Sequence, residues 1–408
     1  MARVTLVLPG GGELELDDEV LAPTRARLAR LGEAPPVRLA FAAAHLVMLP
    51  SYRRAAHSTR EPGSPEEILG HVDWSTTGAL RARLDRLGLG VAEAMDTAQR
   101  FEVGWPVASR LVQLCGRMRL EHPFLAGAGV DHLHGIHSKD ELIDGVVFQA
   151  RFIQRHGGWP IVLPLPWLPQ QGSSEQDYVE VYAAIFRQLD GPLFVHWLGE
   201  MFQPSLRGYF PGNSFRRVLA LEPDKVRGAK LSLLDPRLEL SLRRELLERD
   251  QVLLTGDDLN FARLIRGGDP AKEQEAPPPQ RWTSIGGRRA ALGDFSHALL
   301  GVLDAIAEPA ALALRLLAHG QTRAAMALLG PCEQLGRRLF EPPVQRYKVG
   351  LAYLAWLNGL QDERTLVNRL ERTRPLEHLL EVARLASRAG ALADATLAAH
   401  KLRSLLAQ

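Results

Sequence analysis

Short apolar runs alternate with helix-length amphipathic segments along most of the chain, starting near residue 37. The apolar runs lie at residues 38–48, 89–97, 123–130, 159–166, 192–199, 226–234, 251–258 and 288–295. Fully buried parallel strands are continuous apolar runs of this kind. Eight such strands separated by helices favour a closed (β/α)₈ TIM barrel over an open sheet.

The segments between these runs have the spacing of half-buried helices. Residues 173–189 open with serine ahead of an acidic turn and then place apolar side chains on one face. Residues 237–250 do the same with Leu238, Leu242 and Leu246. Residues 266–287, rich in proline, glycine and charge, break the rhythm and predict an exposed loop before the eighth strand, which could act as a lid.

Both ends of the chain depart from the barrel pattern. Residues 4–16 form two β-prone runs around a proline and three glycines, which predicts a hairpin. After about residue 297 only amphipathic helices rich in alanine and leucine remain. The predicted organisation is an N-terminal hairpin and linker (1–36), a barrel (37–297) and a C-terminal helical extension (298–408).

Composition excludes several classes of partner. The 408 residues carry a net charge of +2, from 49 basic and 47 acidic side chains, and no basic block that would attract nucleic acid. The two cysteines, far apart, fit a reducing cytoplasm and form no metal motif. The N-terminal run is too short and acidic for a signal peptide, and no run of about 18 apolar residues exists to span a membrane. A cytoplasmic protein with neither nucleic acid nor membrane as partner is expected.

One lysine interrupts an apolar run. Lys230 lies within residues 226–234, so a buried strand there would carry an amine inside. An amine shielded from water has its charged form disfavoured, and the neutral amine can form a Schiff base with a carbonyl compound. A solvated lysine at a strand end is an equally open interpretation.

The segments around Lys230 resemble the dihydrodipicolinate synthase and N-acetylneuraminate lyase superfamily. Residues 226–246 and 251–261 are similar to its sixth and seventh strands, in which a Gly-x-Lys strand carries the Schiff-base lysine. Residues 173–197 and 339–359 are similar to its helix and fifth strand and to its C-terminal helices. The resemblance implies a class I aldolase-like lyase that acts on a small keto acid or other small carbonyl compound, without a cofactor, with Lys230 as the imine-forming residue, and it favours a homo-oligomer.

The chain departs from that family at three strand ends. In the fifth strand the family has a tyrosine that relays protons, whereas this chain has no tyrosine there and carries His196. This histidine either supplies the proton or is structural. Trp167 replaces a hydroxylated residue of the fourth strand. It either contacts the substrate or packs at the rim of the barrel. Asp96 and Thr97 stand in place of the turn that binds the carboxylate of a keto acid. Thr97 could keep part of that role, whereas Asp96 would repel a carboxylate unless it is protonated or paired, which makes a neutral carbonyl substrate plausible.

Two other functions remain open from the sequence. His132 and His134 would face the same side of a strand and could hold a divalent metal with Asp131, His45, Asp257 or Asp294, as in a metal-dependent hydrolase or lyase. The third hypothesis is a barrel that binds a ligand without catalysis. The adjacent Asp257 and Asp258 fit either acid–base chemistry or a helix cap, and the cap is the preferred interpretation. Asp294 either lies near the substrate or begins the following helix. The predicted catalytic residues are Lys230 and His196, with Asp96, Thr97, Trp167, Asp257 and Asp294 in substrate binding and no metal or cofactor.

Overall fold

A closed barrel of parallel strands forms the centre of the computed structural model, which describes residues 3–9, 11–269, 271–272, 278–279 and 281–407. The strands, in their order around the barrel, are β12 (His297–Leu300), β3 (Ala40–Ala43), β4 (Gly90–Glu93), β5 (Phe124–Ala128), β6 (Trp159–Val162), β7 (Leu193–Leu198), β8 (Val226–Ser232) and β9 (Val252–Thr255). The predicted (β/α)₈ TIM barrel is therefore confirmed.

Helices connect the strands and cover the outside of the barrel. They are α2 (Pro65–Leu69), α3 (Trp74–Arg86), α4 (Arg100–Arg117), α5 (Lys139–Arg155), α6 (Trp167–Gln170), α7 (Glu175–Arg187), α8 (Ser214–Leu219), α9 (Pro236–Leu247) and α10 (Phe261–Arg266). Helix α7 begins at a capping box in which Ser174 and Asp177 satisfy each other's backbone N–H groups. Asp235 caps α9, with Pro236 at its first position. No helix within the described ranges has the length and apolar content to cross a bilayer.

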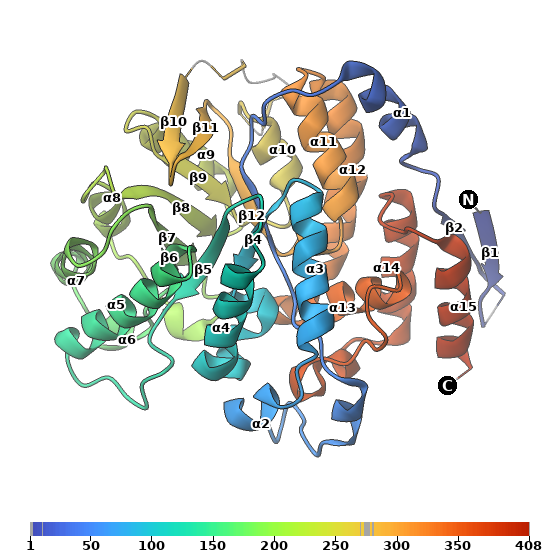
Figure 1. Cartoon of the computed structure of the whole chain (residues 1–408), viewed down its shortest axis with the longest axis horizontal. Helices are drawn as coiled ribbons and strands as arrows, with labels where there is room; N and C mark the ends of the chain where they lie inside the picture. Colours follow the sequence, from blue (N-terminus) through green and yellow to red (C-terminus); the bar gives the residue numbers. More distant parts are fainter. Residues whose placement is uncertain (1–2, 10, 270, 273–277, 280, 408) are drawn as a thin grey trace.

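The two ends of the chain pack against each other beside the barrel (Figure 1). The C-terminal helices are α11 (Ala307–Ala318), α12 (Thr322–Leu339), α13 (Tyr347–Leu357), α14 (Leu376–Arg388) and α15 (Ala395–Leu406). The predicted N-terminal hairpin is formed by β1 (Arg3–Val7) and β2 (Glu13–Asp17), followed by α1 (Ala22–Leu31). The Asp17 N–H donates to Ser387 Oγ at 2.8 Å, so the hairpin is attached to α14.

The eighth strand lies later in the chain than predicted. Residues 288–295 were expected in the barrel, but β11 (Arg288–Leu292) pairs with β10 (Arg281–Ile285) in a separate antiparallel hairpin, and β12 completes the barrel. β12 also extends three residues beyond the predicted barrel boundary at 297. The last three residues of β11 are apolar and buried, as are those of β12, so hydrophobicity alone did not distinguish the two strands.

The hairpin of β10 and β11 closes the amino-terminal end of the barrel. Its Ile285, Ala290 and Leu292 pack in one cluster with side chains that begin the barrel strands, among them Trp159 and Val252. The predicted lid would have to lie at the opposite, carboxyl end. The lid interpretation is therefore wrong for the described part of residues 266–287, while residues 270, 273–277 and 280 lie outside the described residues.

A buried ion pair joins α3 to the second barrel strand. Arg81 donates to both carboxylate oxygens of Glu93, at 2.8 and 2.9 Å, and both side chains are 0% exposed. Arg81 also donates to the carbonyl of His45 at 2.7 Å, just after β3. This guanidinium therefore connects the ends of two neighbouring strands to the helix between them.

Replacing Arg81 with methionine should destabilise the fold strongly, because Glu93 would remain as an unpaired buried charge. We expect a loss of about 3–5 kcal/mol in the free energy of unfolding, measured by urea titration with circular dichroism. The matched control is Arg53→Met, since the pair of Arg53 with Glu363 is largely exposed and should matter little. An Arg81→Met protein as stable as Arg53→Met would contradict this role.

Candidate active site

A small cavity lies at the carboxyl ends of the barrel strands. Its volume is about 30 Å³, which is room for about two water molecules. Its polar lining consists of Asp96, Thr97, His196, Lys230, Ser232, Asp258 and Tyr347. Its apolar lining includes Met95, Phe101, Leu163, Leu198, Phe202 and Phe340. The carboxyl end of a TIM barrel is where such enzymes carry their active sites, so this cavity is the candidate site.

Lys230 reaches this cavity from the interior of β8. The side chain is 9% exposed, and no hydrogen bond or ion pair holds its amine among the described residues. Burial lowers the pKa of Lys230, although the nearby carboxylates of Asp258 and Asp96 oppose this effect. Gly256 leaves room for the lysine stem, because a Cβ at that position would lie 2.8 Å from Lys230 Cε and 2.2 Å from Ser232 Oγ.

His196 lies beside Lys230 on the neighbouring strand β7, in direct register with it. Its Nε2 is 3.1 Å from Ser232 Oγ, and its buried Nδ1 has no partner within the described ranges. Burial and the adjacent Lys230 lower the pKa of His196 well below the ordinary histidine value. The ring is therefore neutral near pH 7 and is poorly suited to donate a proton.

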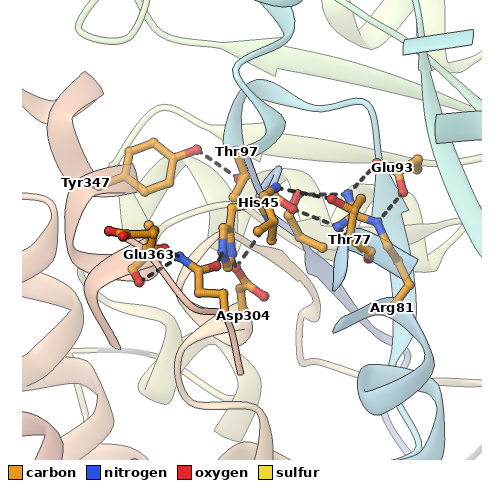
Figure 2. A network of polar contacts seen from close by, with 12 residues as sticks. His45, Thr77, Arg81, Glu93, Thr97, Asp304, Tyr347 and Glu363 are labelled. Carbon is orange, nitrogen blue, oxygen red and sulfur yellow. Dashed lines mark hydrogen bonds and ion pairs between the residues drawn. The ribbon is translucent and has the colours of Figure 1, made fainter. Parts of the chain in front are cut away.

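Asp96 and Thr97 meet the C-terminal extension at the cavity. They lie in the short turn η2 (Asp96–Ala98) after β4, and the first residues of α13 contact both. Lys348 Nζ donates to Asp96 Oδ1 at 2.8 Å, and the Tyr347 hydroxyl donates to Asp96 Oδ2 at 3.1 Å. The Tyr347 hydroxyl also lies 2.8 Å from Thr97 Oγ1 (Figure 2). Asp96 is thus paired with Lys348. Pairing was one of the two conditions, together with protonation, under which Asp96 was expected not to repel a substrate carboxylate.

The two aspartates after β9 have different surroundings. Asp258 lines the cavity and accepts a hydrogen bond from the Val302 N–H at 2.8 Å, and burial raises the pKa of its carboxyl group. Asp257 is not part of the cavity lining and accepts from the N–H groups of Leu259 and Asn260 at 3.0 and 3.1 Å. Asp257 therefore fixes the turn before α10, and Asp258 is the member of the pair whose carboxyl group lines the cavity.

Two other predicted site residues lie away from the cavity lining. Trp167 begins α6, and its indole N–H donates to the Ile136 carbonyl at 3.0 Å. This contact agrees with the interpretation of Trp167 as a packing residue at the barrel rim. Asp294 precedes β12, at the amino-terminal end of the barrel, and pairs with Arg243 and Arg244 at 2.9 and 2.8 Å. Asp294 lies at this end because the eighth strand begins after it, at His297, instead of ending beside it as predicted.

The residues of the metal hypothesis do not converge. His132 and His134 lie in the loop after β5, where His132 stacks on Phe148, and Asp131 pairs with Arg100 at 2.6 Å. No group of three or more His, Cys, Asp or Glu side chains in the described part of the chain could hold a metal ion.

His45 is fully engaged in a different buried contact. Its Nδ1 bonds to Asp304, and its Nε2 lies 2.7 Å from Gln361 Oε1 (Figure 2). The Gln361 amide N–H₂ donates to the carbonyls of Ala352 and Glu363, which orients its oxygen toward His45. The imidazole therefore joins the end of β3 to the C-terminal extension, and both ring nitrogens already have partners.

Sequence reasoning missed three polar residues at this site. Tyr347 and Lys348 lie within residues 339–359, which were matched to the family only as a helical pattern. Ser232 is the last residue of β8 and carried a usable signal, since polar residues at strand ends were the ones sought. Asp258 was considered only as the partner of Asp257, with a helix cap as the preferred interpretation. Tyr347 and Lys348 carried no such signal, because they belong to a helix outside the barrel.

Comparison with solved structures shows the same fold in three enzymes or enzyme relatives. Dihydrodipicolinate synthase from Oceanobacillus iheyensis is 13% identical, with 85% of this chain and 95% of that chain covered and a TM-score of 0.55. N-acetylneuraminate lyase from Mycoplasma synoviae is 12% identical, with 86% and 98% covered and a TM-score of 0.57. A prophage protein of the dihydrodipicolinic acid synthase family from E. coli K12, in complex with pyruvate, is 11% identical, with 86% and 98% covered and a TM-score of 0.55.

The TM-scores and coverages establish a shared fold, and the resemblance expected from the sequence is confirmed at that level. The comparison with curated proteins gives no match. A family model described as "Protein of unknown function (DUF993)" matches residues 14–408. Because this match covers nearly the entire sequence, the chain belongs to that family.

Proposed function

We propose that the chain is a Schiff-base-forming lyase of the class I aldolase type, with Lys230 as the nucleophile. The observation that carries the proposal is a buried amine without hydrogen-bond partners in the described residues, at the carboxyl end of a TIM barrel. A neutral amine attacks a carbonyl carbon, and the resulting protonated imine withdraws electrons from the adjacent bond that is made or broken. The fold shared with two kinds of lyase supports this chemistry.

Asp258 and His196 have supporting positions in this proposal. The lowered pKa of Lys230 and the raised pKa of Asp258 bring the two groups closer in acidity, so a proton can pass from the ammonium group to Asp258 and leave the amine neutral. When the cationic imine forms, Asp258 can ionise and balance the charge. His196, neutral beside the lysine, contacts the substrate, and another group must donate the proton.

The substrate that fits these surroundings is a small neutral aldehyde or ketone. The cavity is narrow and largely apolar, and two of its polar groups are the carboxyl groups of Asp96 and Asp258. Lys348 already neutralises Asp96, and no arginine lines the cavity within the described residues. Once Asp258 has ionised, a substrate carboxylate would therefore meet like charge, and Lys348 is not free to offset it.

Reductive trapping tests the nucleophile and the substrate class together. With borohydride and acetaldehyde, we expect one stable adduct on Lys230, identified by peptide mass spectrometry, and no adduct at that peptide in Lys230→Met. Pyruvate should be trapped at least about 10-fold more slowly, from the like charge it meets. Lys225, which is close in sequence but partly exposed, reports nonspecific labelling. Labelling of Lys230 no faster than Lys225 would contradict the proposal.

Filling the space beside the lysine should block the same reaction. Gly256→Ala places a methyl group against Ser232 Oγ and Lys230 Cε, so the amine must move from its position. We expect trapping at Lys230 to slow by about 10-fold or more, since misplacement of a reacting group by about 1 Å is that costly. Gly330→Ala is the matched control, because a Cβ there meets nothing within 4 Å. Equal trapping by both variants would show that the present lysine position is not required.

The pH dependence of trapping should respond to Asp258. The trapping rate rises with pH as Lys230 loses its proton, and it levels off at lower pH than for an ordinary lysine, because burial lowers the pKa. Asp258→Asn removes a negative charge that favours the ammonium form, so the midpoint should move to lower pH by about one pH unit. Asp269→Asn, at a half-buried carboxylate that pairs with Lys272 and is not part of the cavity lining, should leave the midpoint unchanged. A midpoint that rises in Asp258→Asn would contradict this electrostatic arrangement.

A further inference from the structure

The proposed chemistry needs a proton carrier, and His196 is a poor one. The cavity contains a second candidate, which comes from outside the barrel. Tyr347 is the first residue of α13, and its ring stacks on Phe340 with centroids 4.1 Å apart. A Cβ at Gly301 would lie 3.0 Å from the Tyr347 ring and 3.3 Å from Thr97 Oγ1, so the glycine at this position permits the close approach.

The hydrogen bonds around Tyr347 have a defined direction. Lys348 donates to Asp96 Oδ1 from a side chain that is 2% exposed, so Asp96 is paired with a buried cation. A carboxylate only accepts hydrogen bonds, so the single proton of the Tyr347 hydroxyl is donated to Asp96 Oδ2. The Tyr347 oxygen is then left to accept from the Thr97 hydroxyl at 2.8 Å. This series of hydrogen bonds runs from Thr97 through Tyr347 to Asp96.

We propose that Tyr347, supplied by the C-terminal extension, is the acid–base catalyst of the Schiff-base reaction, and that it moves protons between the substrate and Asp96 through the Thr97 hydroxyl. The inference rests on the proposed function and assigns the proton carrier for that same site. Thr97 and Tyr347 both line the cavity that holds Lys230, and this series of hydrogen bonds ends on a carboxylate paired with a buried cation. Lys348 is a positioning residue that keeps Asp96 ready to accept.

The proton balance of the reaction closes without another reactant. The neutral Lys230 amine attacks the carbonyl carbon, a C–N bond forms, and the carbonyl electrons move to the oxygen. The nitrogen then gives a proton to the relay, which carries it to Asp96. The relay returns that proton to the carbinolamine oxygen, a second proton comes from the protonated Asp258, which ionises, the C–O bond breaks, and one water molecule leaves. The product is the protonated imine, and the relay ends in its starting state.

Removing one hydroxyl group tests the relay. Tyr347→Phe keeps the ring on Phe340 but breaks the proton path, so acetaldehyde trapping on Lys230 should be about 100-fold slower, within the range for general acid–base catalysis. The amount trapped at long times should equal that of the wild type, because Lys230 is unchanged. Thr97→Val should show the same loss, whereas Thr97→Ser keeps the hydroxyl and should restore most of the rate. The double variant Tyr347→Phe with Thr97→Val should be no slower than either single one, since both interrupt one path.

Tyr353→Phe is the matched control for a purely structural effect. Tyr353 lies in the same helix and is fully buried, and its hydroxyl has no partner in the described ranges. Tyr353→Phe should trap acetaldehyde at the wild-type rate, and thermal melting should show both phenylalanine variants folded. A wild-type rate in Tyr347→Phe, with no trapping in Lys230→Met, would overturn the relay alone. Failure of the wild-type protein to be trapped at Lys230 by acetaldehyde or pyruvate would instead overturn the proposed function. If Tyr347→Phe is unfolded, the comparison of Thr97→Val with Thr97→Ser decides, and equal rates in those two variants would overturn the relay.

Discussion

The exclusion of water from one amine is the constraint on which this site depends. A lysine inside a closed parallel barrel has strands on both sides, and here β7 and β9 flank β8 and Lys230 is buried. An isolated ammonium is costly to bury, so the protein either neutralises the group or surrounds it with carboxylates. Here both occur, since burial lowers the pKa of Lys230 while Asp258 and Asp96 lie near enough to oppose that shift. Because these two effects on its pKa oppose each other, Lys230 can change its protonation state at little cost in free energy.

The C-terminal helices are part of this arrangement. Asp96 is held by two residues of α13, and the amide of Gln361 accepts from His45 at the end of β3. Asp258 is fixed by the backbone of Val302, just after the last barrel strand. The mouth of the barrel and the extension are therefore ordered together. The hairpin of β10 and β11 packs against the other end, and the cavity lies at the end that α13 borders.

The sequence predicted those features that depend on contacts near in the chain or on a regular period. The barrel and the buried Lys230 follow from apolar runs and from one charge that interrupts them. The eighth strand was misplaced because β11 and β12 have the same apolar character, and only pairing with β3 and β9 distinguishes them. The pairing of Asp96 with Lys348 spans 252 residues and leaves no local pattern. His132 and His134 gave a metal-like spacing in what proved to be a loop, where the side-chain period of a strand does not apply.

The charges in the cavity bear on substrate selection as well as on catalysis. Lys348 and Asp96 neutralise each other, which leaves Lys230 and Asp258 as the remaining ionisable pair facing the substrate. Once Lys230 becomes a protonated imine, its positive charge persists through the reaction, and the ionised Asp258 balances it. A neutral substrate keeps the cavity electroneutral in this state. A substrate carboxylate would add a negative charge that only solvent could offset, and a cavity of about 30 Å³ has little room for solvent. The same burial that activates the amine therefore also selects against an anionic substrate.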